Sequence, residues 1–296
     1  MSIQIENLNM VFPGGKKALD NLNLEIPSGM FGLLGPNGAG KSTLMRILVS
    51  LLKPTSGKVK IFGYDLQTQR KEIRSLLGYL PQDFRFFANY KTCEFLDYAA
   101  CLSGMTNKKQ RKQAVDSMLE TVGLFDARER YANRLSGGMK RRLGIAQALI
   151  HQPKVIIVDE PTTGLDPEER IRFRNLLSEI SENNVAIILS THIVGDISST
   201  CNCMALMNLG KVSFFGSPEE LLHRAEGKVW RLRVSSEELQ QIDRLYPVIA
   251  TIPSGSRWEV QVVADEIKDF DAEPYPPNLE HAYVYHIENK LDGWND

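Results

Sequence analysis

The chain has 296 residues, and its 35 Lys and Arg against 36 Asp and Glu give a net charge of -1. This length accommodates one large and one small domain, and the near-neutral charge gives no overall basic field for nucleic acid. No uncharged apolar run approaches the roughly 18 residues of a membrane span, and the first residues do not resemble a signal peptide. We therefore expect a soluble, cytosolic protein that binds no nucleic acid.

The chain begins with a predicted pair of strands. Residues 3–5 and 22–26 alternate apolar and polar side chains, which is typical of half-buried strands. We expect them to form an antiparallel flank. Phe12 lies between them, ahead of a Pro-Gly-Gly turn. Its position fits a core residue at a strand end and an aromatic face for an adenine ring equally well.

A phosphate-binding loop follows the apolar run 30–34. The segment Gly35–Thr43 reads G-P-N-G-A-G-K-S-T, a complete G-x-x-x-x-G-K-S pattern between a strand and a helix. Its glycines allow backbone N–H groups to converge on phosphate oxygens, Lys41 adds positive charge, and Ser42 offers a hydroxyl to Mg²⁺. We predict ATP or GTP binding by Gly35, Pro36, Asn37, Gly38, Ala39, Gly40, Lys41, Ser42 and Thr43.

Further strands are predicted at 57–62 and 76–80, the second ending before Gln82, and the pattern then becomes helical. Residues 95, 98, 99 and 102 fall on one helical face, and Gly104 and Gly123 mark helix ends. We expect a helical subdomain at about 91–150. Within it, Ser136 is a predicted N-cap followed by Gly137 and Gly138, so this helix start is a second anion-binding terminus.

Carboxylates follow the next predicted strand. Val155–Val158 is an apolar, mostly β-branched run typical of a buried parallel strand, and Asp159 and Glu160 come directly after it. Because ligands of open α/β sheets bind at the carboxyl ends of strands, these acids are expected beside the phosphate loop. There Asp159 can hold Mg²⁺ and Glu160 can polarise the attacking water. His192, after the next predicted strand at 185–189, can donate to phosphate or water.

The remaining elements are assigned from periodicity. A helix after Pro167 is expected to turn Ile171, Leu176, Leu177 and Ile180 inward. A hairpin is predicted across Gly210, and a capped helix is expected from Ser217 to about residue 224. A boundary at 225–228 precedes strands, a helix at 237–245 and a last helix capped by Asn278, which together predict a small α+β unit.

The order of these motifs resembles that of the ATP-binding subunit of ABC transporters over residues 1–224. The resemblance implies an α/β fold of the P-loop NTPase class, ABC type, with an antiparallel β flank, the helical subdomain at about 91–150 and a small C-terminal α+β domain at 225–296. The motifs that carry it are Gly35–Thr43, Gln82, Leu-Ser-Gly-Gly at 135–138, Asp159-Glu160, Leu165-Asp166 and His192.

The resemblance also implies a role for each motif residue. The loop residues would bind the phosphates and Mg²⁺ of ATP, Phe12 would stack on adenine, and Gln82 would contact Mg²⁺ or the attacking water beside a transmembrane partner. Glu160 would be the general base and His192 the γ-phosphate switch. Ser136, Gly137 and Gly138 would close on the ATP held by a second subunit, with Asp166 contacting across that dimer.

One position departs from the family pattern. Met139 stands where the family usually has glutamine, so we expect altered nucleotide contact with hydrolysis retained. The Met-Lys-Arg-Arg sequence from Met139 and the segment 81–104 resemble the exporter branch that serves separate permeases, and residues 277–282 are similar to its tail. A peripheral location on the cytoplasmic face of the cell membrane, bound to a permease and paired with a second copy, is the implied assembly.

Two features are left open by the sequence. The aromatic group Phe84, Phe86, Phe87 and Tyr90 fits a grip on a permease helix and a local core equally well. Cys201 and Cys203 suggest a metal site, but two thiols without a second pair are more often reduced bystanders, and we assign them no metal.

Rival functions fit less well. A soluble ABC ATPase that acts on ribosomes or another macromolecule normally carries two such domains in tandem. A DNA-repair ATPase would need a coiled coil and a Cys-x-x-Cys hook between Gln82 and Ser136. A regulatory module without turnover conflicts with the presence of Glu160 and His192.

Overall fold

The structure is a computed structural model that describes residues 3–84, 86, 89–182 and 185–291. It divides into two compact units, one of residues 1–196 and 200–215 and one of residues 197–199 and 216–296. The continuous part of the second unit begins at residue 216, before the expected boundary at 225–228. It includes α8 (Pro218–His223), which packs against α10 (Leu279–Leu291). Ser217 caps α8 with a hydrogen bond from the Glu220 N–H, as predicted.

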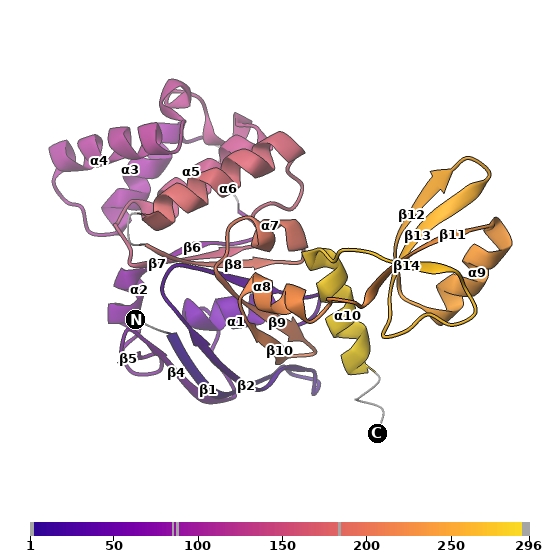
Figure 1. Cartoon of the computed structure of the whole chain (residues 1–296). Coiled ribbons are helices and arrows are strands. Elements are labelled where there is room, and N and C mark those ends of the chain that lie inside the picture. Colours follow the sequence, from indigo (N-terminus) through magenta and orange to yellow (C-terminus); the bar gives the residue numbers. More distant parts are fainter. Residues whose placement is uncertain (1–2, 85, 87–88, 183–184, 292–296) are drawn as a thin grey trace. The chain divides into compact units, whose positions relative to one another are not determined.

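The first unit contains an antiparallel sheet and a mainly parallel sheet (Figure 1). The antiparallel sheet has the order β2-β1-β4-β5, and this confirms the predicted flank. Its strands are β1 (Ile3–Val11), β2 (Lys17–Ile26), β4 (Ser56–Ile61) and the short β5 (Tyr64–Asp65), which the sequence pattern did not reveal. The helix α2 (Arg70–Leu76) was also missed, since it buries only Ile73 among its residues.

The other sheet positions the loops that carry the predicted site. Its order is β10-β9-β3-β8-β7-β6, and β3, β8 and β7 run parallel as neighbours. Leu34 pairs with Thr191, and Asp159 pairs with Ser190, so the carboxyl ends of these strands lie at one edge. The strands are β3 (Met30–Leu34), β6 (Leu77–Leu80), β7 (Val155–Asp159), β8 (Ala186–Thr191), β9 (Cys203–Asn208) and β10 (Lys211–Gly216).

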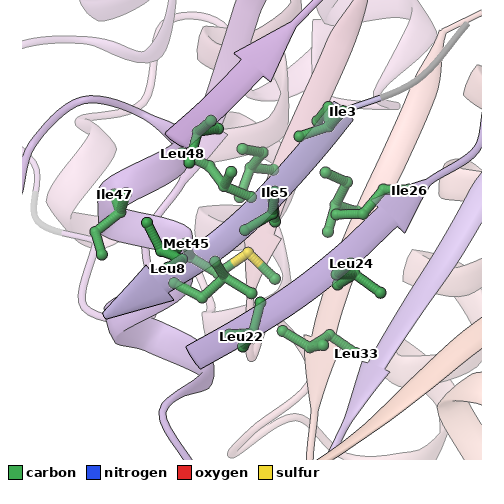
Figure 2. Packing of buried hydrophobic residues seen from close by; sticks show 14 of the residues in the cluster. Ile3, Ile5, Leu8, Leu22, Leu24, Ile26, Leu33, Met45, Ile47 and Leu48 are labelled. Carbon is green, nitrogen blue, oxygen red and sulfur yellow. The ribbon is translucent and has the colours of Figure 1, made fainter. Parts of the chain in front are cut away.

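A hydrophobic core joins the two sheets through α1 (Lys41–Leu48). The buried side chains of β1 and β2 pack with Leu33 of β3 and with Met45, Ile47 and Leu48 of α1 (Figure 2). This core holds both ends of the phosphate loop, because β3 enters the loop and α1 leaves it.

The helical part follows the prediction in outline and differs in detail. Its helices are α3 (Thr92–Leu102), α4 (Lys108–Thr121) and α5 (Gly137–Leu149), with short turns at Phe125–Ala127 and Ala132–Arg134. Phe95 is buried, but Tyr98 and Leu102 of the same predicted face are 41% and 70% exposed. Leu102 is the last residue of α3.

The helix α6 (Pro167–Glu182) corrects one prediction. Leu176, Leu177 and Ile180 are buried as expected, but Ile171 is 49% exposed and Phe173 takes the inward position. At about 100° per residue, Ile171 lies about 140° from Leu176 around the helix, whereas Phe173 lies about 60° from it. The prediction for Ile171 was therefore wrong. The short α7 (Val194–Ser198) follows β8.

The second unit is an antiparallel sheet with a helix on one face. The sheet has the order β12-β13-β11-β14 and comprises β11 (Val229–Val234), β12 (Val248–Ser254), β13 (Arg257–Val263) and β14 (Ala272–Pro274). Buried residues of β11 and β13 pack against Ile242 of α9 (Ser236–Leu245), which confirms the predicted alternation of these two strands. Asn278 caps α10 by accepting the His281 N–H at 2.9 Å. Among the described residues, no helix is long and apolar enough to cross a membrane.

Candidate active site

The loop between β3 and α1 has a backbone that only glycine fits at two positions. A Cβ at Gly35 would lie 2.2 Å from the Met207 carbonyl oxygen. Gly40 has φ of 104°, and a Cβ there would lie 2.5 Å from the Ala18 carbonyl oxygen. Because glycine has no Cβ at these two positions, the loop can turn directly into α1. The first N–H groups of α1 then point toward the site.

The Lys41 side chain is held inside this loop. Its ammonium donates to the Gly35 and Pro36 carbonyl oxygens at 2.7 and 3.2 Å, and it lies 3.4 Å from the Glu160 carboxylate. Only 4% of Lys41 is exposed. Burial lowers the pKa of the ammonium, while the negative charges of Glu160 and Asp159 oppose this shift.

Asp159 is buried and bound by two hydroxyls. Ser42 donates to its Oδ1 at 3.2 Å, and Ser190 at the end of β8 donates to the same oxygen at 2.5 Å. Gln82, after β6, brings its amide near the same edge. Carboxylate, hydroxyl and amide oxygens are the ligands that Mg²⁺ prefers, so the predicted metal residues Ser42, Asp159 and Gln82 fit that ion.

Glu160 is presented by an unusual backbone. Its φ of 46° lies in the left-handed region, which is uncommon for a residue with a side chain. The Ser190 carbonyl and hydroxyl oxygens both accept its N–H, at 3.0 and 3.2 Å. Such strain costs about 1–3 kcal/mol and clusters at functional sites.

The Glu160 carboxylate gathers several polar groups. Its Oε2 lies 3.1 Å from His192 Nδ1 and accepts hydrogen bonds from Gln82 at 3.4 Å and Thr163 at 3.5 Å. Its Oε1 faces Lys41. The structure thus brings together Glu160, His192 and Gln82, the residues predicted to be catalytic, although they come from three different loops.

These residues line one open pocket of about 570 Å³. Phe12 forms part of its wall and is half-buried, in a turn closed by a hydrogen bond from its N–H to the Lys16 carbonyl at 2.9 Å. Phe12 also packs against the hydrophobic core, so the adenine-facing and the core interpretations of this residue both stay open. The sequence prediction missed Lys16, Lys17 and Thr163, which line the same pocket; the two basic residues after the Pro-Gly-Gly turn were the available signal. The pocket is lined by Phe12, Lys16, Lys17, Ala18, Asn37–Thr43, Gln82, Glu160, Thr163 and His192.

The second predicted anion-binding terminus lies in a neighbouring pocket. Ser136 caps α5 by accepting the Met139 N–H at 3.3 Å, and Gly137 lines a hollow of about 300 Å³ with Lys140 and Arg141. This hollow shares Gln82 and Thr163 with the phosphate-loop pocket. A Cβ at Gly138 would lie 1.9 Å from a Glu169 carboxylate oxygen, so the helix start and α6 approach closely here. Residues 136–138 do not line the pocket of the phosphate loop in the described chain.

Asp166 is exposed and directly precedes α6. Its Oδ1 accepts the Glu169 N–H at 2.8 Å, which makes it an N-cap within its own chain. It does not line the phosphate-loop pocket in the described residues. A contact across a dimer is therefore the remaining nucleotide-related interpretation of Asp166.

The aromatic group near Gln82 separates into two parts. The rings of Phe84 and Phe86 lie 6.0 and 5.0 Å from buried Phe95, so both belong to a local core. Tyr90 is 37% exposed and its ring lies 5.9 Å from that of Tyr98. Phe87 lies outside the described residues.

Comparisons with known proteins identify the family. A family model described as ABC transporter matches residues 19–163. The chain is 40% identical over 205 residues to the uncharacterized ABC transporter ATP-binding protein YxlF of Bacillus subtilis, covering 69% of this chain and 67% of that protein. It is 39% identical over 201 residues to the bacitracin transport ATP-binding protein BcrA of Bacillus licheniformis, covering 67% and 64%. It is also 36% identical over 243 residues to the methionine import ATP-binding protein MetN of Corynebacterium diphtheriae, covering 79% and 71%.

The chain thus spans about two thirds of the length of YxlF and BcrA. Among solved structures, CbiO1 of Clostridium perfringens, part of the CbiONQ ABC transporter complex, has a TM-score of 0.69 at 27% identity, covering 82% of this chain and 94% of that one. The ATP-binding cassette MJ0796, solved as a dimer in a post-hydrolysis state with ADP and Pi, has a TM-score of 0.67 at 25% identity, covering 73% and 98%. The predicted fold class is confirmed. The chain belongs to the ATP-binding proteins of the ABC transporter family, and it is an ATPase.

Proposed function

We propose that this chain powers an ABC exporter whose transmembrane permease is a separate polypeptide. Two copies close around ATP and open after its hydrolysis. The observation that carries the proposal is that the similar cassette MJ0796 was solved as a dimer in a post-hydrolysis state with ADP and Pi. Within this chain Gly137 does not line the phosphate-loop pocket, although the two pockets share Gln82 and Thr163. We therefore propose that the loop of one copy and the α5 terminus of another complete each site, which a two-fold pair supplies twice.

The proposed chemistry follows from the groups around Glu160. The Glu160 carboxylate accepts the proton of the attacking water, and the contacts from Gln82, Thr163 and His192 fix its orientation. His192, which directly follows β8, contacts the γ-phosphate in this proposal. Lys41 and the α1 N-terminus bind the phosphates, and Phe12 stacks on the adenine.

Mg²⁺ belongs to this proposal. The hydroxyl of Ser42, the carboxylate of Asp159 and the amide oxygen of Gln82 are its proposed ligands, partly through water. When bound, the ion neutralises charge that develops on the phosphate oxygens. Asp166 contributes a contact between the two copies.

Opening and closing are driven by the phosphate contacts. A change from a mostly open to a mostly closed population requires ATP to bind the closed state about 5.5 kcal/mol more tightly than the open state. Charge-assisted hydrogen bonds to phosphate contribute about 1.5–3 kcal/mol each, so a few of them suffice. Loss of the γ-phosphate removes part of this stabilisation and shifts the pair toward opening.

A permease is the proposed membrane partner. The exposed pair Tyr90 and Tyr98 lines a pocket of about 630 Å³ beside the loop of Gln82, and this surface is the proposed seat of a cytoplasmic permease helix. The protein would then be peripheral on the cytoplasmic face of the cell membrane. Export is proposed because the Met-Lys-Arg-Arg sequence from Met139 and the segment 81–104 resemble the exporter branch. The relatives include both the bacitracin transport protein BcrA and the import protein MetN.

Trans-complementation tests the shared site. Lys41→Ala should abolish turnover by damaging the phosphate loop, and Ser136→Arg should abolish it by blocking the α5 terminus. Mixing the two variants should restore activity, because a mixed pair regains one complete site. Recovery near a quarter of the wild-type rate is expected if copies pair at random and each intact site works alone. No recovery, with both variants folded and able to pair, would show that each chain works alone.

Capture from detergent-solubilised membranes tests the partner. The chain should co-purify with a multi-span protein, and Tyr98→Glu should weaken this association while leaving nucleotide binding unchanged. Phe86→Glu is unsuitable because Phe86 packs on Phe95. Co-purification with a ribosome or another soluble assembly in place of a membrane protein would favour the alternative, a soluble ABC ATPase with a macromolecular partner outside transport.

A further inference from the structure

A buried carboxylate lies behind the catalytic loops and has no part in the function proposed above. Asp196 of α7 is 0% exposed. Its Oδ2 accepts the hydroxyl of Thr162 at 2.5 Å and that of Thr191 at 3.2 Å. Its Oδ1 is also buried and has no hydrogen-bond partner among the described residues.

The two threonines belong to the loops that carry the proposed catalytic residues. Thr162 lies two residues after Glu160, and Thr191 directly precedes His192. The Thr191 oxygen also accepts the Ile193 N–H at 2.9 Å, so the residues on both sides of His192 are held. Thr162 and Thr191 are each 1% exposed, and water does not compete for these hydrogen bonds.

A buried acid with an unpartnered oxygen lowers the free energy of unfolding, because no hydrogen bond compensates the desolvation of that oxygen. An apolar side chain of similar size would fill the space between the two loops at lower cost, but it would leave the hydroxyls of Thr162 and Thr191 without an acceptor. The carboxylate is the group that joins the two loops through a single oxygen. The position of Asp196 therefore indicates a functional role at the site in addition to packing.

We propose that Asp196 is a positioning residue that holds Glu160 and His192 in contact by fixing Thr162 and Thr191. The proposal rests on the proposed roles of Glu160 and His192. Asp196 is buried and does not line the phosphate-loop pocket in the described residues, so it acts through the 3.1 Å contact between His192 Nδ1 and Glu160 Oε2. Loss of the link lets the two loops move apart and lowers the chemical rate, while the phosphate loop and Phe12 still bind ATP.

Steady-state kinetics on the full chain test this. Asp196→Ala should lower kcat about 10- to 100-fold with the KM for ATP changed less than about threefold, since misplacement of a catalytic group by 1 Å costs on the order of 100-fold. Asp196→Asn should keep most of the rate, because one amide oxygen can accept both hydroxyls. Thr162→Val, with Thr162→Ser as its control, gives a milder version if Asp196→Ala does not fold.

The decisive arm combines variants. If Asp196 acts through the His192 contact, Asp196→Ala should lower kcat far less in a His192→Ala background than in the wild type. Equal losses in both backgrounds, or an unchanged kcat in folded Asp196→Ala or Thr162→Val, would overturn the positioning role. A wild-type rate in His192→Ala and Glu160→Gln would instead contradict the proposed function, so the two failures are distinguishable.

Discussion

His192 Nδ1 lies 3.1 Å from Glu160 Oε2, and the two residues follow neighbouring parallel strands, β8 and β7. They are separated by 31 residues in sequence (positions 161–191) and meet because the carboxyl ends of the two strands share one edge of the sheet. The contact joins Glu160, the proposed general base, to His192, the proposed γ-phosphate switch.

Glu160→Gln should separate binding from chemistry. The amide keeps the size of the side chain and can still accept from Gln82 or Thr163, but it cannot take a proton from water. We expect kcat to fall about 100-fold or more with ATP affinity retained. Phosphate release and equilibrium nucleotide binding measure the two effects. Unchanged hydrolysis would remove Glu160 from the mechanism.

The same variant should stabilise the closed pair. With hydrolysis blocked and ATP and Mg²⁺ saturating, mass photometry should show a particle of twice the chain mass. Lys41→Ala on the same background is the control and should stay monomeric, since the phosphate loop no longer holds the nucleotide. A monomer in both cases would contradict the proposed pair.

Phe12→Ala should weaken binding of the base and spare binding of the phosphates. Stacking of a base on an aromatic ring contributes about 1–3 kcal/mol, so the Kd for ATP should rise about 5- to 150-fold. Phe12→Trp is the matched control and should bind nearly as the wild type. Calorimetry with ATP and with inorganic tripolyphosphate distinguishes the two interpretations. If Phe12 is a core residue, Phe12→Ala should weaken the binding of both ligands and lower the melting temperature.

His281 should make the second unit sensitive to acid. Its Nδ1 accepts the Asn278 N–H at 3.1 Å and its Nε2 lies 3.1 Å from Gln261 Oε1, so the neutral ring satisfies both neighbours. Burial lowers the pKa of His281 in the folded chain, against a weaker opposing effect of Glu280. Because the unfolded chain then binds more protons, this contribution to stability is complete above about pH 6.5 and is lost as the pH falls below it.

His281→Gln provides the matched comparison, since glutamine serves the same capping position without titrating. The urea midpoint for unfolding of the second unit should fall more between pH 7.5 and 5.5 in the wild type than in His281→Gln. Parallel pH profiles for the two proteins would show that His281 does not contribute to the pH dependence of stability.

The cysteines should differ sharply in reactivity. Burial raises the pKa of the Cys201 thiol to about 12, whereas Cys101 is exposed on α3. At pH 8 Cys201 is almost wholly protonated, and the thiolate is the nucleophile. Iodoacetamide followed by peptide mass spectrometry should find Cys101 alkylated first and Cys201 only after unfolding. Early modification of Cys201 in the folded Cys101→Ser variant would contradict this.

The local chemistry of this protein could be predicted from its amino-acid sequence. The glycine spacing of Gly35–Thr43, the buried run ending in Asp159-Glu160 and the Ser136 cap depend on neighbours within a few residues, so their patterns are readable in one dimension. The same holds for the alternation of β1, β11 and β13. Ile171 was misplaced because Phe173, a better match to the α6 inward face, was overlooked.

Which of these segments lie in contact depends on the three-dimensional fold. Strand order brings Gln82 and His192 to the Glu160 carboxylate, and packing on Phe95 assigns Phe84 and Phe86 to a core. Thr163 and the buried Asp196 carry no motif, since their roles depend on contacts between segments far apart in the chain. Such contacts arise from the sheet register and from core packing, which no single stretch of sequence encodes.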